Sequence, residues 1–290
     1  MKYILITGAN KGIGLASVEK VLNTHSDTHI FLGSRDKDRG FAAKRDLMNK
    51  NTDIQDRVSV LQLDVTNTES IKNAFSEVEH KIKDNTLYGI VNNAGVARGS
   101  LKHILDVNVS GIHRICAAFI PLLSRPDGRV VNVTSAAGPS YVATCSQANQ
   151  DLLTKNDISW TEVKAFMGLC LNVQGGANDF KSQGLGSGSH YGISKACANA
   201  LTLHLAHQNP NLKINACTPG FIETDMTRPM AVYNNKTPQE MGMKPPSEGT
   251  ISIMHLLFGD PPGNGRYYGS DALRSPLDRY RSPGDPPYVD

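Results

Sequence analysis

A tyrosine and a lysine stand four positions apart in the segment Tyr191-Gly192-Ile193-Ser194-Lys195. On a helix, this spacing places both side chains on the same face, one turn apart. A phenol has a pKa near ~10, and bringing it to about 7 requires roughly 4 kcal/mol of differential stabilisation. One ammonium group about 4 Å away supplies about 4 kcal/mol at an effective dielectric constant of 20. The pair therefore predicts a tyrosine that exchanges a proton with a bound molecule under the influence of Lys195.

The Y-x-x-x-K spacing is weak evidence alone, because any helix can carry it by chance. Polar and small residues in four other segments accompany it: Asn92–Gly95, Asn108, Asn132–Ser135 and Pro219–Gly220. The strand-end segments among them fall at the carboxyl ends of predicted strands, which is the edge where open α/β sheets bind ligands. We therefore expect these side chains to meet at one site.

The first predicted strand ends in a glycine-rich segment, Thr7-Gly8-Ala9-Asn10-Lys11-Gly12-Ile13-Gly14. Glycines let the backbone turn tightly and approach a pyrophosphate, whose charge then lies at the N-terminus of the following helix. The spacing is G-x-x-x-G-x-G rather than the G-x-G-x-x-G of the standard dinucleotide motif. A glycine-rich turn without a ligand is the alternative, but the strand–turn–helix context favours dinucleotide binding.

The segment GSRD after the second strand bears on the choice of cofactor. An NAD-binding protein usually has an acidic residue about 20 positions beyond the glycine loop. Here Ser34 and Arg35 occupy that position, and a guanidinium suits a ribose 2′-phosphate. Lys11 and Arg39 could add positive charge. These residues predict NADPH, although Arg35 could be an ordinary solvated cation and Asp36 leaves the use of NAD open.

Six short apolar runs predict buried strands, because both faces of each run are apolar. Segments with helical spacing lie between them, and this order predicts a doubly wound parallel sheet, the Rossmann fold, with helices on both faces. In the third helical segment, Thr66 and Glu69 form a T-x-x-E capping box. The runs cover Tyr3–Ile6, His29–Leu32, Val58–Leu61, Leu87–Val91, Arg129–Val133 and Lys213–Ala216.

Two regions interrupt this alternation within what we predict to be one domain over residues 1–290. Residues 139–190 form a long insertion, in which Ser159 and Glu162 make a capping box that predicts a helix over Trp160–Leu171. Residues 259–290 are rich in Pro and Gly and predict an irregular surface tail with one strand at Arg266–Tyr268. The tail could close over a binding site or pack elsewhere on the surface.

Composition argues against several classes of partner. Lys and Arg number 30 against 27 Asp and Glu, so no strongly basic surface indicates nucleic acid. The longest apolar stretches, such as Ile251–Phe258, are far shorter than the roughly 20 residues of a membrane helix. The first residues lack the features of a signal peptide. The five cysteines include no CxxC pair, so we expect free thiols, no metal site and a cytoplasmic protein.

Together these segments resemble the classical short-chain dehydrogenase/reductase family, and within it the NADPH-dependent carbonyl reductases. The resemblance extends over almost the whole chain, to about Gly259. It implies an oxidoreductase that transfers a hydride from NADPH to the carbonyl carbon of a ketone, aldehyde or quinone, giving an alcohol. Its most specific segments are Thr7–Gly14, Ser34–Gly40, Leu63–Val65, Asn92–Gly95, Asn132–Gly138, Tyr191–Lys195 and Thr218–Met226.

The resemblance also implies a catalytic role for four matching residues. Tyr191 would be the proton donor, and Ser135 would hydrogen-bond the substrate oxygen. Lys195 would hold the nicotinamide ribose and tune Tyr191, while Asn108 would anchor a water in the proton relay. These roles suit a reaction in which negative charge develops on the carbonyl oxygen.

The residues expected to contact the cofactor come from the same motifs. Asp64 would bond the adenine amino group, and Thr224 would contact the carboxamide. Three alternatives stay open: Asp64 could be only a helix cap, Asn108 only a residue at a helix kink, and Thr134 rather than Ser135 could be the exposed hydroxyl. The full cofactor set is Gly8, Asn10, Lys11, Gly12, Ile13, Gly14, Ser34, Arg35, Arg39, Asp64, Val65, Asn92, Ala94, Gly95, Tyr191, Lys195, Pro219, Gly220, Ile222 and Thr224.

The segment between Ser135 and Tyr191 is much longer than in most of the family. It resembles the insertion of monomeric carbonyl reductases, where extra residues cover helix faces that otherwise build a tetramer, so we expect a monomer. A surface excursion that leaves oligomerisation intact is the alternative. Side chains that could line an apolar substrate wall together with Ser135, or could instead belong to the core, are Tyr141, Trp160, Phe221 and Met226.

Two other functions stay open. NADP-dependent oxidation of a specific secondary alcohol would use the same residues, because the sequence does not set the direction. A non-catalytic dinucleotide-sensing protein would keep the cofactor site without turnover, and the intact set Asn108, Ser135, Tyr191 and Lys195 argues against it. In each case we expect a small molecule as the partner rather than nucleic acid or a membrane.

Overall fold

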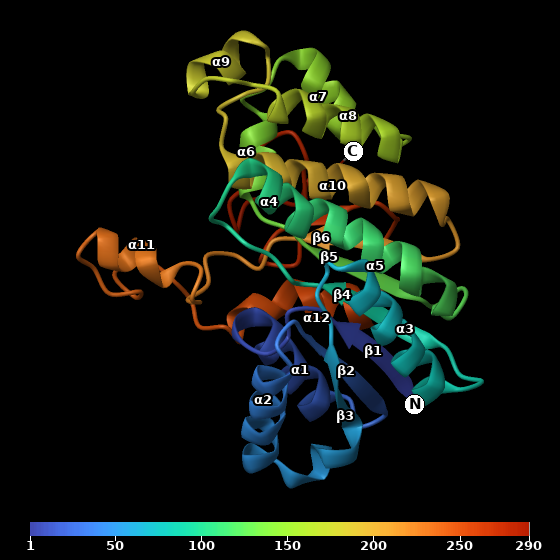
Figure 1. Cartoon of the computed structure of the whole chain (residues 1–290). Coiled ribbons are helices and arrows are strands. Elements are labelled where there is room, and N and C mark those ends of the chain that lie inside the picture. Colours follow the sequence, from blue (N-terminus) through green and yellow to red (C-terminus); the bar gives the residue numbers. More distant parts are fainter. Residues whose placement is uncertain (290) are drawn as a thin grey trace.

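The computed structural model describes residues 1–289, which are built on one eight-stranded sheet (Figure 1). The strand order is β3-β2-β1-β4-β5-β6-β7-β8. All neighbouring strands are parallel except β7 and β8, which confirms the predicted doubly wound fold. The strands are β1 (Lys2–Ile6), β2 (Thr28–Ser34), β3 (Val58–Gln62), β4 (Leu87–Asn92), β5 (Arg129–Val133), β6 (Lys213–Cys217), β7 (Tyr267–Tyr268) and β8 (Arg274–Ser275).

The order of the strands reverses between β1 and β4, whose carboxyl ends therefore flank the crevice where such sheets bind ligands. All six predicted strands form. Most extend beyond their apolar run, because polar residues at the ends still pair in the ladder, as Ser34 does with Gln62 and Asn92 with Asn132. These strand ends bring polar side chains to the edge of the crevice.

Helices cover both faces of the sheet (Figure 1). Alternate residues of β1 show the two sides, since Ile4 and Ile6 belong to a core cluster with α1, α2 and α12, and Leu5 to one with α3, α5 and α10. The helices are α1 (Gly12–Thr24), α2 (Lys37–Lys50), α3 (Thr68–Ile82), α4 (Leu101–Leu105), α5 (Gly111–Phe119), α6 (Ala137–Val142), α7 (Gln147–Thr154), α8 (Trp160–Leu171), α9 (Ala177–Ser182), α10 (His190–Gln208), α11 (Arg228–Tyr233) and α12 (Ile251–Phe258).

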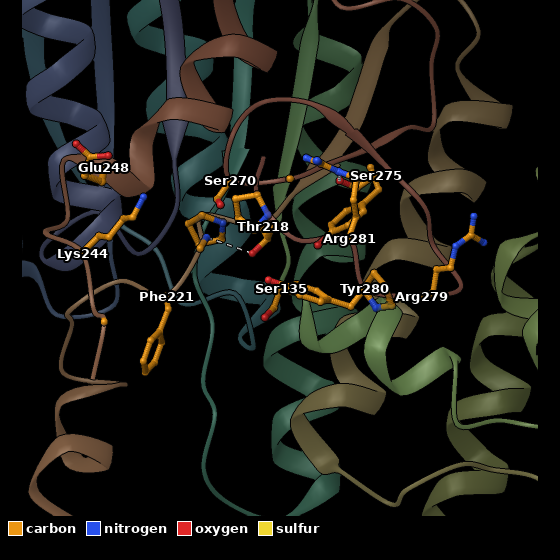
Figure 2. A pocket seen from close by; sticks show the side chains of 18 residues that line it. Ser135, Thr218, Phe221, Lys244, Glu248, Ser270, Ser275, Arg279, Tyr280 and Arg281 are labelled. Atoms are coloured by element: carbon orange, nitrogen blue, oxygen red, sulfur yellow. Dashed lines mark hydrogen bonds between the residues drawn. The ribbon is translucent and has the colours of Figure 1, made fainter. Parts of the chain in front are cut away.

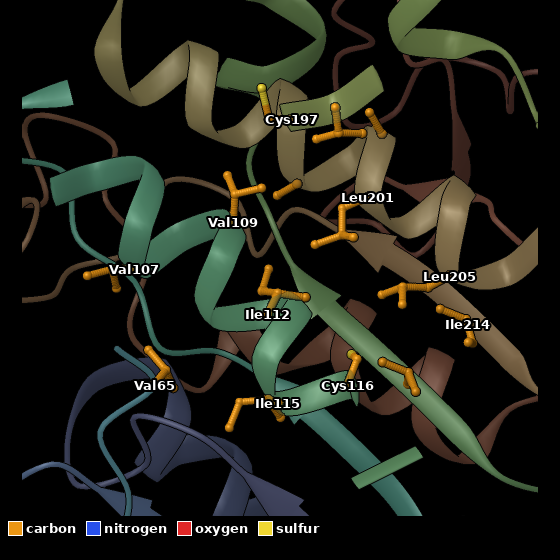
Figure 3. Packing of buried hydrophobic residues seen from close by; sticks show 14 of the residues in the cluster. Val65, Val107, Val109, Ile112, Ile115, Cys116, Cys197, Leu201, Leu205 and Ile214 are labelled. Carbon is orange, nitrogen blue, oxygen red and sulfur yellow. The ribbon is translucent and has the colours of Figure 1, made fainter. Parts of the chain in front are cut away.

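Helix α10 is buried over most of its length, and residues 192–203 are all buried. On one side it packs against β6, and on the other against α6, α8 and the turn before α5. Figure 3 shows Val109 and Ile112 of this turn and α5 in the same cluster as Leu201 and Leu205 of α10. This packing fixes the position of the residues near the start of α10.

A π-helical turn, Asp106–Ser110, joins α4 to α5. The continuous stretch Leu101–Leu122 is long and apolar enough by composition to cross a membrane. However, 61% of its most apolar window is buried inside the protein, against α3, α10 and β4. A core helix has these same properties.

The insertion of residues 139–190 is mostly helical and lies against α10 and α4 (Figure 1). Helix α8 has the predicted bounds, Trp160–Leu171, and the capping box is confirmed. The Ser159 hydroxyl accepts a hydrogen bond from the Glu162 amide, and the Glu162 carboxylate accepts one from the Ser159 amide. Helices α7 and α9 were not predicted.

The prediction of a capping box at Thr66 and Glu69 is wrong. Helix α3 begins at Thr68, and its cap is Asn67, whose side chain accepts a hydrogen bond from the Ser70 amide. Asp64 explains the difference, because its carboxylate accepts hydrogen bonds from both the amide and the hydroxyl of Thr66. With its hydroxyl engaged there, Thr66 leaves the capping position to its neighbour.

The tail is more ordered than predicted. The strand expected at Arg266–Tyr268 forms at Tyr267–Tyr268, and Arg274–Ser275 pairs with it antiparallel. Tyr267 and Tyr268 are both buried. The expectation of an irregular surface segment is therefore wrong for this part of residues 259–290.

Candidate active site

Two glycines of the loop after β1 allow it to lie directly against the end of β4. Gly8 has a φ of +61°, and a Cβ on it would lie 2.8 Å from Ala94 Cα. A Cβ on Gly14 would lie 2.5 Å from Asn93 Nδ2. Neither position has room for a side chain, so the loop meets the NNAG segment backbone to backbone.

Hydrogen bonds of Thr7 and Asn93, two residues outside the predicted cofactor set, hold the same contact in place. The Thr7 hydroxyl accepts hydrogen bonds from the amides of Asn93 and Ala94, both at 3.0 Å. The Asn93 side chain donates to the carbonyls of Thr7 and Gly8, also at 3.0 Å. The position of Asn93 inside the quoted NNAG motif was the only signal of this function.

Helix α1 begins at the loop with no competing side chain. Its cap, Lys11, makes no side-chain hydrogen bond to the helix, and the first turn contains no acidic residue. Gly12 has a φ of +56°, and a Cβ on it would lie 3.4 Å from the Thr224 methyl group. The loop and the segment after β6 therefore lie side by side at the uncapped N-terminus of α1, which is the arrangement that pyrophosphate binding requires.

The predicted phosphate-binding cations differ in what they already contact. Arg39 lies 3.4 Å from the Asp36 carboxylate, which caps α2, and Lys11 pairs with Asp225 at 2.7 Å. Ser34 is buried and donates to the Asp36 carbonyl. Arg35 is exposed, and no ion pair or hydrogen bond of its side chain occurs within residues 1–289. Its guanidinium is therefore free for a phosphate group.

Of the two neighbouring residues expected at the adenine, Asp64 is half-buried and Val65 is buried. Asp64 is not the cap of α3, which answers that alternative, and only one of its carboxylate oxygens is engaged, with Thr66. Val65 is buried, and a Cβ on Gly111 would lie 2.8 Å from it. Its side chain packs between β3 and α5.

The Asn92 side chain needs a correction, because it turns into the sheet rather than along the cofactor groove. It is buried and donates to the Asn132 side chain at 2.8 Å, and Asn132 donates to the Thr202 hydroxyl at 2.8 Å. This chain of hydrogen bonds ties β4, β5 and α10 together. Only the backbone of Asn92 remains available to a cofactor.

Tyr191 and Ser135 come together from different elements. Tyr191 lies in the first turn of α10, whose cap is Ser189, and Ser135 follows β5. Their side chains lie near enough for the Ser135 hydroxyl to affect the pKa of Tyr191. Thr134 is buried and donates to the Cys217 carbonyl, so the exposed hydroxyl at the end of β5 belongs to Ser135.

Lys195 is buried one turn further along α10. Its ammonium donates to the Val133 carbonyl at 3.1 Å and lies 5.5 Å from the centre of the Tyr191 ring. Burial lowers the pKa of Lys195 to about 8. Burial also raises the pKa of Tyr191, and the Ser135 hydroxyl opposes this only partly. The lowering of the phenol pKa by Lys195 together with an oxidised nicotinamide stays a prediction for the complex with the cofactor.

The Asn108 side chain connects three segments around Lys195. It lies in the π-helical turn, exchanges two hydrogen bonds of 2.8 Å with the Val96 backbone and donates to the Ser194 hydroxyl at 3.0 Å. A Cβ on Gly95 would lie 3.3 Å from Asn108 Oδ1 and 3.7 Å from the Lys195 ammonium. Asn108 therefore lies at an irregular turn of the helix and also makes polar contacts. The structure brings Asn108, Gly95 and Lys195 together.

A cavity of about 370 Å³ opens beside Ser135 (Figure 2). Ser135 and Phe221, which were predicted to lie near a substrate, line it together with Pro219 and Gly220, which were predicted to contact the cofactor. Tyr191 and Lys195 are not part of its lining within the described residues. The cavity therefore reaches the catalytic group from the Ser135 side.

Three of the candidate wall residues do not reach this cavity. Tyr141 is buried in the core and donates to the Leu185 carbonyl. Trp160 stacks on His113 of α5, with the ring centres 4.2 Å apart. Met226 is half-buried and is not part of the lining. Their apolar character reflects packing, and Phe221 alone among the four remains a wall residue.

The segment after β6 also holds its predicted cofactor residues near the loop. Ile222 is buried, and Gly249 lies between it and Ile13, because a Cβ on Gly249 would lie 3.0 Å from one side chain and 3.2 Å from the other. Asn10 is half-buried in the loop. The far wall of the cavity comes from the tail, as one of the two alternatives for the tail predicted, but its residues Arg279 and Tyr280 were not among the predicted site residues.

Comparisons with known proteins agree with this geometry. A family model described as short chain dehydrogenase matches residues 2–147. Carbonyl reductase (NADPH) 3 of Rattus norvegicus is 32% identical over 78% of this chain and 84% of its own length. Carbonyl reductase (NADPH) 1 of Homo sapiens is 31% identical over 90% and 92%. The structure of salutaridine reductase from Papaver somniferum has a TM-score of 0.75 and 25% identity, and covers 92% of this chain and 99% of that one.

The buried lysine predicts a pH-dependent difference in stability between the protein and a Lys195→Met variant. Between pH 8 and about 10.5 the unfolded chain holds a proton that the folded chain has released, so the folded wild type gains stability as the pH rises. Relative to Lys195→Met, the gain should reach about 3 kcal/mol, measured by urea unfolding at several pH values.

The matched control is Lys236→Met, which removes an exposed lysine. It should give the same difference from wild type at every pH. A pH-independent difference for Lys195→Met as well would show that Lys195 keeps its ordinary pKa in the folded protein.

Proposed function

Because this chain belongs to the short-chain dehydrogenase/reductase family, we propose that it is an NADPH-dependent carbonyl reductase. It transfers a hydride to the carbonyl carbon of a ketone, aldehyde or quinone, and Tyr191 gives the proton to the oxygen. The observation that carries this proposal is the grouping of Tyr191 with the buried Lys195, whose ammonium lies 5.5 Å from the Tyr191 ring, and with Ser135, which faces a cavity.

The proton donor works because its surroundings keep it protonated. Bound NADPH would supply the hydride. The raised pKa of Tyr191 keeps the phenol neutral at pH 7, and it donates together with Ser135 to an oxygen on which negative charge develops. Lys195, with a pKa of about 8, is mostly charged at pH 7 and stabilises the phenolate that remains after the proton has moved.

The preference for NADPH rests on Arg35. It stands at the end of β2, exposed and without a protein partner in the described chain, at the position expected to meet a ribose 2′-phosphate. The names of the two carbonyl reductase relatives, which specify NADPH, support the same choice.

We also infer that the protein is a monomer. Helices α7 and α8 of the insertion pack against α10, and α8 also packs against α4, so the insertion covers helix surfaces that would otherwise be open to a second chain. Light scattering should give a mass near 31.4 kDa. A mass near two or four times this value would show that the insertion does not prevent assembly.

Replacing the proton donor should separate chemistry from cofactor binding. Tyr191→Phe removes the phenol hydroxyl and nothing else, so we expect carbonyl-dependent NADPH oxidation to fall by at least about a hundredfold, with NADPH affinity unchanged in a fluorescence titration. Tyr233→Phe, at a tyrosine that is 88% exposed, is the control. Retained turnover in Tyr191→Phe would remove Tyr191 as the acid.

A panel of carbonyl compounds and alcohols, tested with NADPH and NADP⁺, distinguishes carbonyl reduction from alcohol oxidation and from dinucleotide sensing. Turnover only with secondary alcohols and NADP⁺ would show that the protein works as a dehydrogenase. Tight NADPH binding without turnover of any carbonyl or alcohol would support the dinucleotide-sensing alternative.

Reversing the charge at Arg35 should change cofactor choice. Arg35→Asp places a carboxylate beside the 2′-phosphate, so the Kd for NADPH should rise by about tenfold or more, since one charge-assisted bond is worth roughly 1.5–3 kcal/mol. The Kd for NADH, which lacks the phosphate, should change little. Arg45→Asp makes the same charge change at an exposed position of α2. Equal losses for the two cofactors would exclude Arg35 from the phosphate site.

A further inference from the structure

A second cavity lies between helix α4 and the insertion helix α8, which pack against each other. Its volume is about 500 Å³, and small-molecule sites commonly have volumes of about 300–1,000 Å³. The lining comes from the start of α4, the π-helical turn Asp106–Ser110 and the last two turns of α8. Within the described residues, it shares no lining residue with the cavity beside Ser135. We call it the α4–α8 cavity.

Three apolar side chains form one side of the α4–α8 cavity. Leu105 of α4 and Met167 of α8 are buried beneath it, and Leu171 at the end of α8 is 42% exposed. An apolar side chain that is open to water gains free energy when another apolar group covers it. This side of the cavity therefore suits a hydrocarbon group.

Two cations at the same cavity have no partner in the protein. Lys102 and His103 are exposed lining residues, and neither side chain makes an ion pair or a hydrogen bond within residues 1–289. The lining also holds one acidic residue of the described chain, Asp106, whose carboxylate is already paired with Arg114 at 2.5 Å. The charge left unpaired at the cavity is therefore positive, and it suits a carboxylate.

The cavity touches the turn that carries Asn108. Asp106 and Ser110, the two ends of this π-helical turn, are lining residues. Asn108 between them is buried and bonds instead to the segment before α4 and to α10. Arg114, the partner of Asp106, donates to the Val65 carbonyl at 3.2 Å. One short turn thus has the cavity on one side and the contacts of Asn108 on the other, and π-helical turns often occur at functional sites.

We propose that the α4–α8 cavity binds an amphiphilic carboxylate, which is a molecule with one carboxylate group and a short hydrocarbon chain. The chain covers Leu171 and Met167, and the carboxylate pairs with Lys102. This ligand site is separate from the proposed reductase site, and it does not depend on that reaction. Because the occupant contacts Asp106 and Ser110, it stabilises the turn that holds Asn108.

Calorimetry with octanoate and 1-octanol tests the site, using NADPH-saturated protein so that the cofactor is in place. Lys102→Glu should raise the Kd for octanoate by about tenfold or more, because one charge-assisted contact is lost. The Kd for 1-octanol, which has no charge, should stay within about twofold. Leu171→Ala should raise both Kd values by about fivefold, because the chain loses part of its apolar contact.

Two control variants make matched changes outside the lining. Leu169→Ala removes a leucine of α8 that is 53% exposed, and Lys181→Glu reverses the charge of an exposed lysine on α9. Both should bind octanoate as wild type does. Absence of octanoate binding by wild type, or unchanged binding in Lys102→Glu and Leu171→Ala, would overturn the site. A dimer by light scattering that dissociates in Leu171→Ala would show that a second copy covers the cavity, and it would also overturn the proposal.

Hydrogen exchange locates the ligand without any variant. Octanoate should slow amide exchange in residues 101–110 and 163–171 by about twofold or more, because a ligand stabilises the segments that it contacts against local opening. Residues 269–283, which border the other cavity, should exchange as before. Slower exchange in residues 269–283 alone would place octanoate beside Ser135 and would contradict the proposed site.

Discussion

The arrangement of the site depends on one buried charge, the Lys195 ammonium. Removing it from water is costly, and its hydrogen bond to the Val133 carbonyl offsets part of this cost at the carboxyl end of β5. Gly95 packs beside it, since a Cβ there would lie 3.7 Å from the ammonium and 3.3 Å from Asn108 Oδ1. Because α10 is packed on all sides, Lys195 cannot withdraw to solvent, and Tyr191 one turn away is held with it.

A second constraint couples the cofactor groove to the catalytic group. The Thr7 and Asn93 hydrogen bonds join the ends of β1 and β4, and Asn108 joins the segment just after them to α10. The glycine loop, the NNAG segment and the start of α10 therefore form one connected polar framework. Small residues at its contacts allow the backbones to approach, which explains why glycine spacing and catalytic spacing occur together in one sequence.

Much of the fold and part of the site could be predicted, because they depend on local patterns. The buried apolar runs predicted the six strands, and the capping box of Ser159 and Glu162 predicted α8 with its observed bounds. The prediction of a capping box at Thr66 was wrong because the Asp64 side chain accepts a hydrogen bond from the Thr66 hydroxyl. The prediction that Tyr141 lines the substrate site was wrong because its surroundings depend on the contact of α6 with α10, which are distant in the sequence. The tail wall had no periodic signal, since it is organised by the side chain of Arg281 across a segment rich in Pro and Gly.

The separate origin of the two sides of the cavity has an evolutionary consequence. Tyr191, Lys195 and the glycine loop come from the sheet and α10, whereas the wall opposite Phe221 comes from residues 269–283. Substitutions in that stretch leave Tyr191 and Lys195 in place, because few of the contacts that hold them involve it. A descendant of this protein can therefore acquire a differently shaped cavity through substitutions in the tail alone, with Tyr191 and Lys195 inherited unchanged.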